Sequence, residues 1–210
     1  EVRVFGKMYQ NGHIYKGLKP VHWCSHCGTA LAEAEIEYAD DPCYSVYVKF
    51  EVTDDKGKLF SMGAVPGKTY VVIWTTTTWT LPANVAICLG PNFDYALLKA
   101  NREGETEYYV VAKELAANVM QEAGIEEYEI ISTVKGSELE YVECAHPFLD
   151  RKSILILGDH VTLDSGTGCV HTAPGHGVED YDVCHNHYPE IPIVVPVDSH
   201  GKMTEEAGQF

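Results

Sequence analysis

The 210-residue chain predicts a β-rich α+β fold, a β-barrel or sandwich with a few peripheral helices, and of these two we expect the closed β-barrel. Many short runs have strand-like composition, whereas only two or so stretches read as helices. Residues 44–52 read Tyr-Ser-Val-Tyr-Val-Lys-Phe-Glu-Val and alternate strictly, which is typical of a half-buried strand. Residues 70–74, Tyr-Val-Val-Ile-Trp, are apolar on both faces, which predicts a strand buried within the sheet.

The beginning of the chain predicts little regular structure. Residues 1–22 lack a strong periodicity, and residues 30–36 form a short helical-looking run. Between them, Cys24-Ser-His-Cys27 has the spacing of two zinc ligands, or of a plain hairpin tip. A structural zinc site needs four ligands, and the other five cysteines are scattered along the chain.

Strands and two helices share the rest of the chain. Lys113 to Glu122 places apolar side chains at helical spacing, and Gly124 supplies a stop signal. A second helix begins near Val178 and runs toward His187. Further strand-like runs recur at residues 95–99, 108–111, 128–132, 153–157 and 193–197.

No repeat, low-complexity tract or linker divides this stretch. We therefore expect a leading segment, residues 1–43, packed on the same domain as the barrel of residues 44–210. The chain opens on Glu1 without an initiator methionine, so we expect a fragment of a longer protein.

The charge balance restricts the possible partners. Fifteen Lys and Arg stand against 31 Asp and Glu, a net charge of −16, which argues against a general nucleic-acid binder. Any nucleic acid must therefore be held locally. Seven cysteines without framework spacing, and no secretory signal, predict a reducing, cytoplasmic location. No run is apolar for long enough to span a membrane, so we expect no membrane partner.

The stretch from Trp74 to Asn84, WTTTTWTLPAN, is unusual for a core strand. A threonine hydroxyl costs free energy when it is buried without a partner. In a regular strand Thr75 and Thr77 would face one way and Thr76 the other. The three hydroxyls can therefore serve one site only if the chain bends or bulges within residues 75–78.

The second unusual stretch is GTGCVHTAPGHGVEDYDVCHNHY, residues 166–188. A strand-like GCVHT leads through a Pro-Gly-His-Gly loop into a helix whose first turn holds Glu179 and Asp180. Simple capping explains carboxylates at this place, because helix amides stabilise negative charge. The sharper interpretation is that Asp180 stays ionised to receive a cationic group. His171 alone is more often structural than functional.

Taken together, the two stretches resemble the editing domain of the isoleucyl-tRNA synthetases, a family of class I synthetases. The upstream KPVHWCSHCGTALAEAEIEY resembles the beginning of the same insertion, so the resemblance covers essentially the whole chain. Related valyl and leucyl enzymes have Arg-Pro where this chain reads Trp79-Thr-Leu-Pro82, which favours the isoleucyl branch. The chain departs from the family pattern at Thr78, where many members have proline. This difference affects the rigidity of the local backbone and leaves the first three threonines in place.

The resemblance implies a hydrolase that removes valine wrongly attached to the isoleucine tRNA. It implies that Thr75, Thr76 and Thr77 hold the terminal adenosine and the attacking water, and that Asp180 binds the α-ammonium group. It also implies that His171 bounds the amino-acid side-chain pocket. The remaining residues that we expect to contact the substrate are Trp74, Trp79, Asn84, Gly175 and His176.

No covalent nucleophile is evident, so a positioned water is expected to attack the ester directly. Editing needs no cofactor in this interpretation, and the partners are the 3′ end of the tRNA and the remainder of the synthetase. A second cysteine pair outside this chain would complete a zinc site at Cys24 and Cys27. The sequence leaves open whether valyl-adenylate is also hydrolysed. Alternatives are a zinc-ribbon interaction module, an inactive relic, and an editing domain of a valyl or leucyl enzyme.

Overall fold

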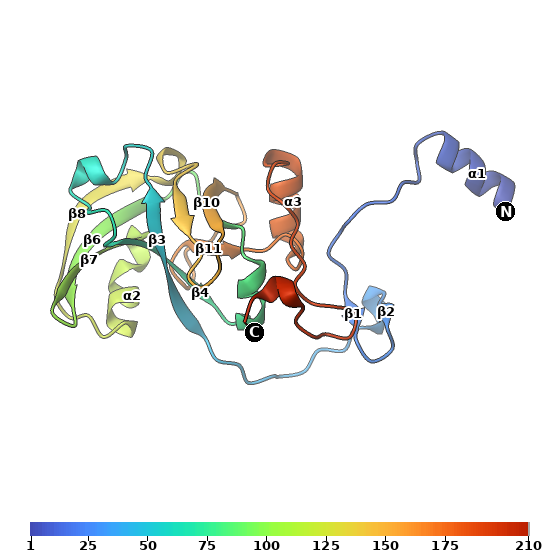
Figure 1. The fold of residues 1–210 in the computed structure, drawn as a ribbon, viewed down its shortest axis with the longest axis horizontal. Coiled ribbons are helices and arrows are strands. Elements are labelled where there is room, and N and C mark those ends of the chain that lie inside the picture. Colours follow the sequence, from blue (N-terminus) through green and yellow to red (C-terminus); the bar gives the residue numbers. More distant parts are fainter. Residues whose placement is uncertain (210) are drawn as a thin grey trace.

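The computed structural model describes residues 1–209, and its body is a long, curled β-sheet (Figure 1). The strands are β1 (Trp23–Cys24), β2 (Thr29–Ala30), β3 (Val46–Asp54), β4 (Thr69–Thr75), β5 (Ala86–Leu89), β6 (Asp94–Arg102), β7 (Glu105–Ala112), β8 (Tyr128–Lys135), β9 (Glu143–Ala145), β10 (Lys152–Leu157) and β11 (Cys169–Thr172). The helices are α1 (Val2–Gln10), α2 (Ala116–Glu122) and α3 (Val178–His187). The 3₁₀ turns are η1 (Glu33–Glu35), η2 (Phe60–Met62), η3 (Thr78–Ala83), η4 (Lys113–Leu115), η5 (Gly136–Glu138) and η6 (Glu205–Ala207).

The sheet is open, so the expectation of a closed barrel is wrong. Its strand order is β11-β5-β10-β9-β3-β4-β7-β6-β8, with parallel pairs at β5–β10 and β4–β7. Closure requires the two edge strands to pair with each other. Here the curl brings the edge strand β11 against β4, and the N–H of Ala112 at the end of β7 donates to Thr167 O at 2.8 Å. Within residues 1–209, strand β8 pairs only with β6, beyond this contact, so the two edges of the sheet do not meet.

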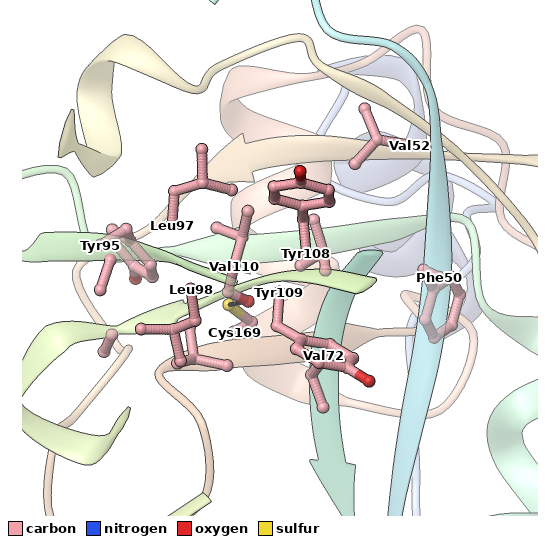
Figure 2. Close-up of a cluster of buried hydrophobic side chains, with 14 of the residues drawn as sticks. Phe50, Val52, Val72, Tyr95, Leu97, Leu98, Tyr108, Tyr109, Val110 and Cys169 are labelled. Carbon is pink, nitrogen blue, oxygen red and sulfur yellow. Dashed lines mark hydrogen bonds between the residues drawn. The ribbon is translucent and has the colours of Figure 1, made fainter. Parts of the chain in front are cut away.

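The core lies inside the curl and follows the predicted alternation. Phe50 and Val52 of β3 are buried whereas Glu51 between them is exposed, as the two-residue period requires. Figure 2 shows these side chains beside buried residues of β4, β6 and β7, with Cys169 of β11. The β-rich interpretation and the strands predicted from residue 44 to residue 157 are confirmed.

The predicted helices are confirmed, but two other local expectations are wrong. Residues 113–122 form η4 and α2, and α3 begins at Val178 as expected. Residues 193–197 form no strand, apart from one bridge between Val197 and Met203. Pro192 and Pro196 have no N–H for a ladder, which accounts for the irregular backbone. At the other end, α1 occupies part of the stretch that seemed to lack periodicity.

The N-terminal part stands away from the sheet (Figure 1). None of residues 1–43 is buried, and α1 carries exposed Val2, Phe5 and Tyr9. The β1–β2 hairpin is joined to the C-terminal part of the chain by the Trp23 indole N–H, which donates to Ser199 O at 2.8 Å. The division between residues 1–43 and the rest stays a prediction. Among the described residues, no helix has the length and apolar character needed to cross a membrane.

A buried tyrosine hydroxyl holds one end of the β5–β11 pair. Tyr95 is fully buried; its hydroxyl accepts from Gly90 N at 2.9 Å and donates to Gly168 O at 2.6 Å. Gly90 follows β5 and Gly168 precedes β11, so this one group fixes the end of that edge against β6.

Tyr95→Phe should therefore lower the free energy of unfolding by about 1–3 kcal/mol, because two buried backbone groups lose their partner. Urea unfolding measures the change. Tyr108→Phe is the matched control, since Tyr108 is 8% exposed and its hydroxyl makes no described hydrogen bond. Equal stability of the two variants would contradict this role of the Tyr95 hydroxyl.

Candidate functional site

The threonine run bends, as predicted, where β4 ends. Strand β4 stops at Thr75 and the 3₁₀ turn η3 begins at Thr78. Thr75 is buried, and its hydroxyl oxygen accepts from Thr77 N at 3.0 Å. Thr76 and Thr77 are exposed beyond the bend. The bend thus removes them from strand alternation and leaves their hydroxyls accessible, whereas Thr75 supports the turn.

His171 of β11 joins the second stretch to this turn. Its Nε2 lies 3.1 Å from Thr80 Oγ1, which in turn donates to Thr77 O at 2.9 Å. Its Nδ1 lies 2.8 Å from Asn84 Nδ2. The two motifs, about ninety residues apart in sequence, are therefore hydrogen-bonded to each other through one imidazole.

The surroundings of His171 disfavour its charged form. Burial, together with smaller effects of the nearby His146 and His176, lowers the pKa of His171 to about 4. The ring is therefore neutral near pH 7. A neutral ring with both nitrogens hydrogen-bonded to the protein can form a fixed wall.

Asp180 closes the loop between β11 and α3. It is the third residue of α3 after the N-cap Gly177, and its Oδ2 accepts from Ala173 N at 2.9 Å. A Cβ on Gly177 would lie 2.6 Å from that oxygen, so glycine is what lets the carboxylate fold back. Burial raises the pKa of Asp180, while the Ala173 N–H opposes the rise. The carboxylate does not cap the helix by a side-chain hydrogen bond, and its Oδ1 makes no described bond.

The two stretches also meet through rings. Trp79 is half exposed and packs edge-on against His176, with centroids 5.2 Å apart. His176 Nε2 is buried and has no hydrogen-bond partner among the described residues. Thr76 and Asp180 lie in these two neighbouring segments, but no hydrogen bond or ion pair between them is described.

Trp74 and Gly175, two other residues predicted to contact the substrate, are explained by packing. Trp74 packs against Gly166, where a Cβ would lie 3.2 Å from the indole. Gly175 approaches Val194 O so closely that a Cβ would lie 2.4 Å from it. Packing therefore accounts for both residues without a ligand.

The structure adds residues that sequence analysis missed. Ser153 Oγ donates to Asn84 Oδ1 at 2.7 Å, and Arg151 donates to Pro82 O at 2.8 Å and to Asn84 O at 3.2 Å. His146 Nε2 lies 2.9 Å from Leu81 O. These groups hold η3 from β10 and from the segment before it. No sequence motif marks them, because they lie some seventy residues from their partners.

The cysteine pair lies at an exposed hairpin tip. Cys27 N donates to Cys24 Sγ at 3.3 Å, and this bond is the main reason why the pKa of Cys24 is lowered. A lowered thiol pKa suits a metal ligand. The described residues contain no group of three or more His, Cys, Asp or Glu that could hold a metal. The pair can supply two of four zinc ligands, so the zinc site stays a prediction.

A separate cavity of about 640 Å³ lies along α3. Four carboxylates contribute to its wall, and none of the predicted site residues lines it. Close negative charges repel phosphate groups. This cavity is therefore a poor site for a tRNA end. The residues that line it are Pro91, Glu140, Tyr141, Leu157, Gly158, Asp159, His160, Glu179, Asp182, Val183, His187 and Tyr188.

By sequence, this chain is similar to tRNA synthetases. Residues 1–144 match the family of class I tRNA synthetases (I, L, M and V). The whole chain aligns at 57% identity with 22% of the isoleucine–tRNA ligase of Caldicellulosiruptor saccharolyticus. It aligns at 51% identity with 21% of the isoleucine–tRNA ligase of Moorella thermoacetica. The chain thus spans about a fifth of the length of these relatives.

Two solved structures have a similar fold. GlLeuRS-CP1 aligns over 73% of this chain and 71% of its own, with a TM-score of 0.60 and 19% identity. The editing domain of the P. knowlesi cytosolic leucyl-tRNA synthetase aligns over 72% and 67%, with a TM-score of 0.58 and 14% identity. At these identities the likeness concerns the fold alone.

The lowered pKa of His171 has a measurable consequence. In NMR titrations the ring signals should stay constant from pH 8 to pH 5.5 and change around the pKa of about 4. Because the folded pKa lies below the unfolded value of about 6.5, the contribution of His171 to stability is complete above that value. This contribution is lost progressively as the pH falls from 6.5 toward 4. A midpoint above pH 6 would contradict the burial of the ring.

Proposed function

The chain belongs to the class I tRNA synthetases (I, L, M and V), and we propose that it is the part of an isoleucine enzyme that hydrolyses valine from wrongly charged isoleucine tRNA. The observation that carries the proposal is the His171 bridge, which joins the threonine turn to the β11–α3 loop. The names of the isoleucine–tRNA ligase relatives and the editing-domain fold support it.

Such an activity answers a known chemical limit. A pocket that accepts isoleucine rejects valine poorly, because one methylene gives only about 1–3 kcal/mol of discrimination; the isoleucine enzymes are themselves the standard example. A second, smaller site that admits valine and excludes isoleucine restores accuracy.

In this proposal the exposed hydroxyls of Thr76 and Thr77 hold the terminal adenosine and the attacking water. Thr75 supports the turn through its bond to Thr77 N. Asn84 is fully buried, and its amide is used by protein partners, so it acts on the substrate only through His171. Trp79 and His176 form the neighbouring wall.

Asp180 receives the α-ammonium group of the bound valine. One of its oxygens is held by Ala173 N, which fixes the direction of the carboxylate and leaves the other oxygen for the ligand. Burial raises its pKa in the free protein. A cation beside the carboxylate favours the ionised form, so substrate and Asp180 stabilise each other's charge.

The hydrolysis proceeds by direct attack of water. The water oxygen bonds to the ester carbonyl carbon, the bond to the ribose oxygen breaks, and that oxygen takes the proton, with the adjacent ribose hydroxyl assisting. His171 is a poor base for this step, because both of its nitrogens are engaged and its pKa is low. Catalysis then rests on positioning and electrostatics.

The wider assignments follow from the same proposal. The partners are the tRNA 3′ end and the remainder of a cytoplasmic synthetase. A structural zinc at Cys24 and Cys27 would be completed by ligands outside this chain. With a net charge of −16, the chain offers no extended surface for phosphates, so the pocket would hold only the unpaired end.

Asp180→Asn should lower the deacylation rate of Val-tRNA roughly 10- to 100-fold, the range that a charge-assisted hydrogen bond of about 1.5–3 kcal/mol supplies. The amide keeps an acceptor for Ala173 N, so the fold is retained. Asp182→Asn, on the exposed side of the same helix, is the control and should be unchanged. An unchanged rate for Asp180→Asn would leave Asp180 as a loop-closing residue only.

His171→Ala should begin to hydrolyse correctly charged Ile-tRNA while retaining activity on Val-tRNA. Removing the wall relieves overpacking of about 1–3 kcal/mol against the additional methylene, and the ester stays in place. Deacylation of both substrates measures the outcome. If His171 were a general base, its removal would lower the deacylation of both substrates. An equal loss on both, without a gain on Ile-tRNA, would therefore contradict the role of His171 as a steric wall.

A further inference from the structure

A buried serine stands behind the proposed site without touching it. Ser153 of β10 is fully buried, and the four residues of the strand that follow it are apolar. Strand β10 pairs in parallel with β5, with Ile154 opposite Ala86, and this register sets Ser153 beside Asn84. A buried hydroxyl needs a partner, and the partner here is the Asn84 side chain.

The donors and acceptors of this cluster allow one assignment that satisfies every group. Ser153 donates to Asn84 Oδ1, and Asn84 Nδ2 donates to Ala86 O at 2.9 Å and toward His171 Nδ1 at 2.8 Å. His171 Nδ1 must therefore accept, and a neutral imidazole then carries its proton on Nε2. That N–H donates to the Thr80 hydroxyl, whose own proton goes to a backbone carbonyl of the threonine turn.

The opposite arrangement would break this chain. With Asn84 turned over, its Oδ1 would face the Ala86 carbonyl, and His171 would need its proton on Nδ1. Thr80 would then have to donate to Nε2, and Thr77 O would keep only the Thr80 backbone N–H at 3.3 Å and lose the shorter bond from the Thr80 hydroxyl. The hydrogen bond that Ser153 donates to Asn84 and the bond from Thr80 to Thr77 O therefore depend on each other through the His171 ring.

We infer that Ser153 is a positioning residue that, through Asn84, holds the His171 imidazole as the Nε2–H tautomer and fixes it as a rigid wall. The consequence for selectivity between valine and isoleucine rests on the proposed function, whereas the tautomer does not. Ser153 touches no substrate; it acts by orienting the amide that orients the ring.

The first experiment reads the tautomer directly. In the ¹⁵N-labelled chain at pH 7, long-range ¹H–¹⁵N NMR spectra should show a protonated Nε2 and an unprotonated Nδ1 for His171. A protonated Nδ1 would overturn the inference.

The second experiment removes the serine hydroxyl. In Ser153→Ala the two ¹⁵N shifts of His171 should move toward each other, because Asn84 Oδ1 loses its donor and the amide is less fixed. Deacylation of Ile-tRNA relative to Val-tRNA should rise roughly five-fold or more, as expected when one buried hydrogen bond is lost. Ser153→Cys, which has a much weaker donor of similar size, should give a smaller change in the same direction and serves if the alanine variant fails to fold.

The matched control is Thr69→Val. Thr69 is also fully buried on a strand, and its hydroxyl donates to Val65 O at 2.8 Å at the far end of β4. It should lose stability without changing the His171 signals or the substrate ratio. Unchanged His171 signals in both Ser153 variants would show that Ser153 is only structural and would overturn the inference. If the native chain deacylates neither substrate, the proposed function fails. The NMR measurements of the His171 tautomer and of the Ser153 variants then decide the role of Ser153 by themselves.

Discussion

The double pairing of strand β5 is the constraint on which the site depends. All four of its residues are buried; β10 pairs with it in parallel on one side and β11 in antiparallel on the other. Asn84 lies just before this strand, so one ladder brings Ser153 to it and the other brings His171. The backbone registers, set by the whole sheet, therefore place side chains that are far apart in sequence within hydrogen-bond reach.

Hydrogen bonds between neighbouring polar groups hold this arrangement together. Burial lowers the pKa of His171 and raises that of Asp180, because it disfavours the charged form of each group. Hydrogen bonds from fixed partners hold each group in place before any ligand arrives. The polar groups of a site held in this way need little rearrangement when a ligand binds.

The open sheet has a role of its own. A closed barrel would pair its two edge strands and bury both, whereas the curl here lets β11 lie against β4 with its loop free to lead into α3. The end of β4 carries the threonine turn, and the loop after β11 carries His176 and the segment that Asp180 closes. The contact between an edge strand and a middle strand thus brings the two polar stretches onto one face.

The sequence alone determined the features that depend on near neighbours. Alternation over residues 44–52 and the spacing over 113–122 predicted elements correctly, and the threonine run predicted its own bend, since consecutive hydroxyls cannot all face one side of a strand. Only the tertiary structure decided that the sheet stays open, that Thr80 and Ser153 complete the hydrogen-bond chain through His171, and that residues 193–197 form no strand. The reason is that ladder register and buried hydrogen bonds join residues 69 to 91 positions apart, and no local pattern encodes which distant partner satisfies a buried polar group.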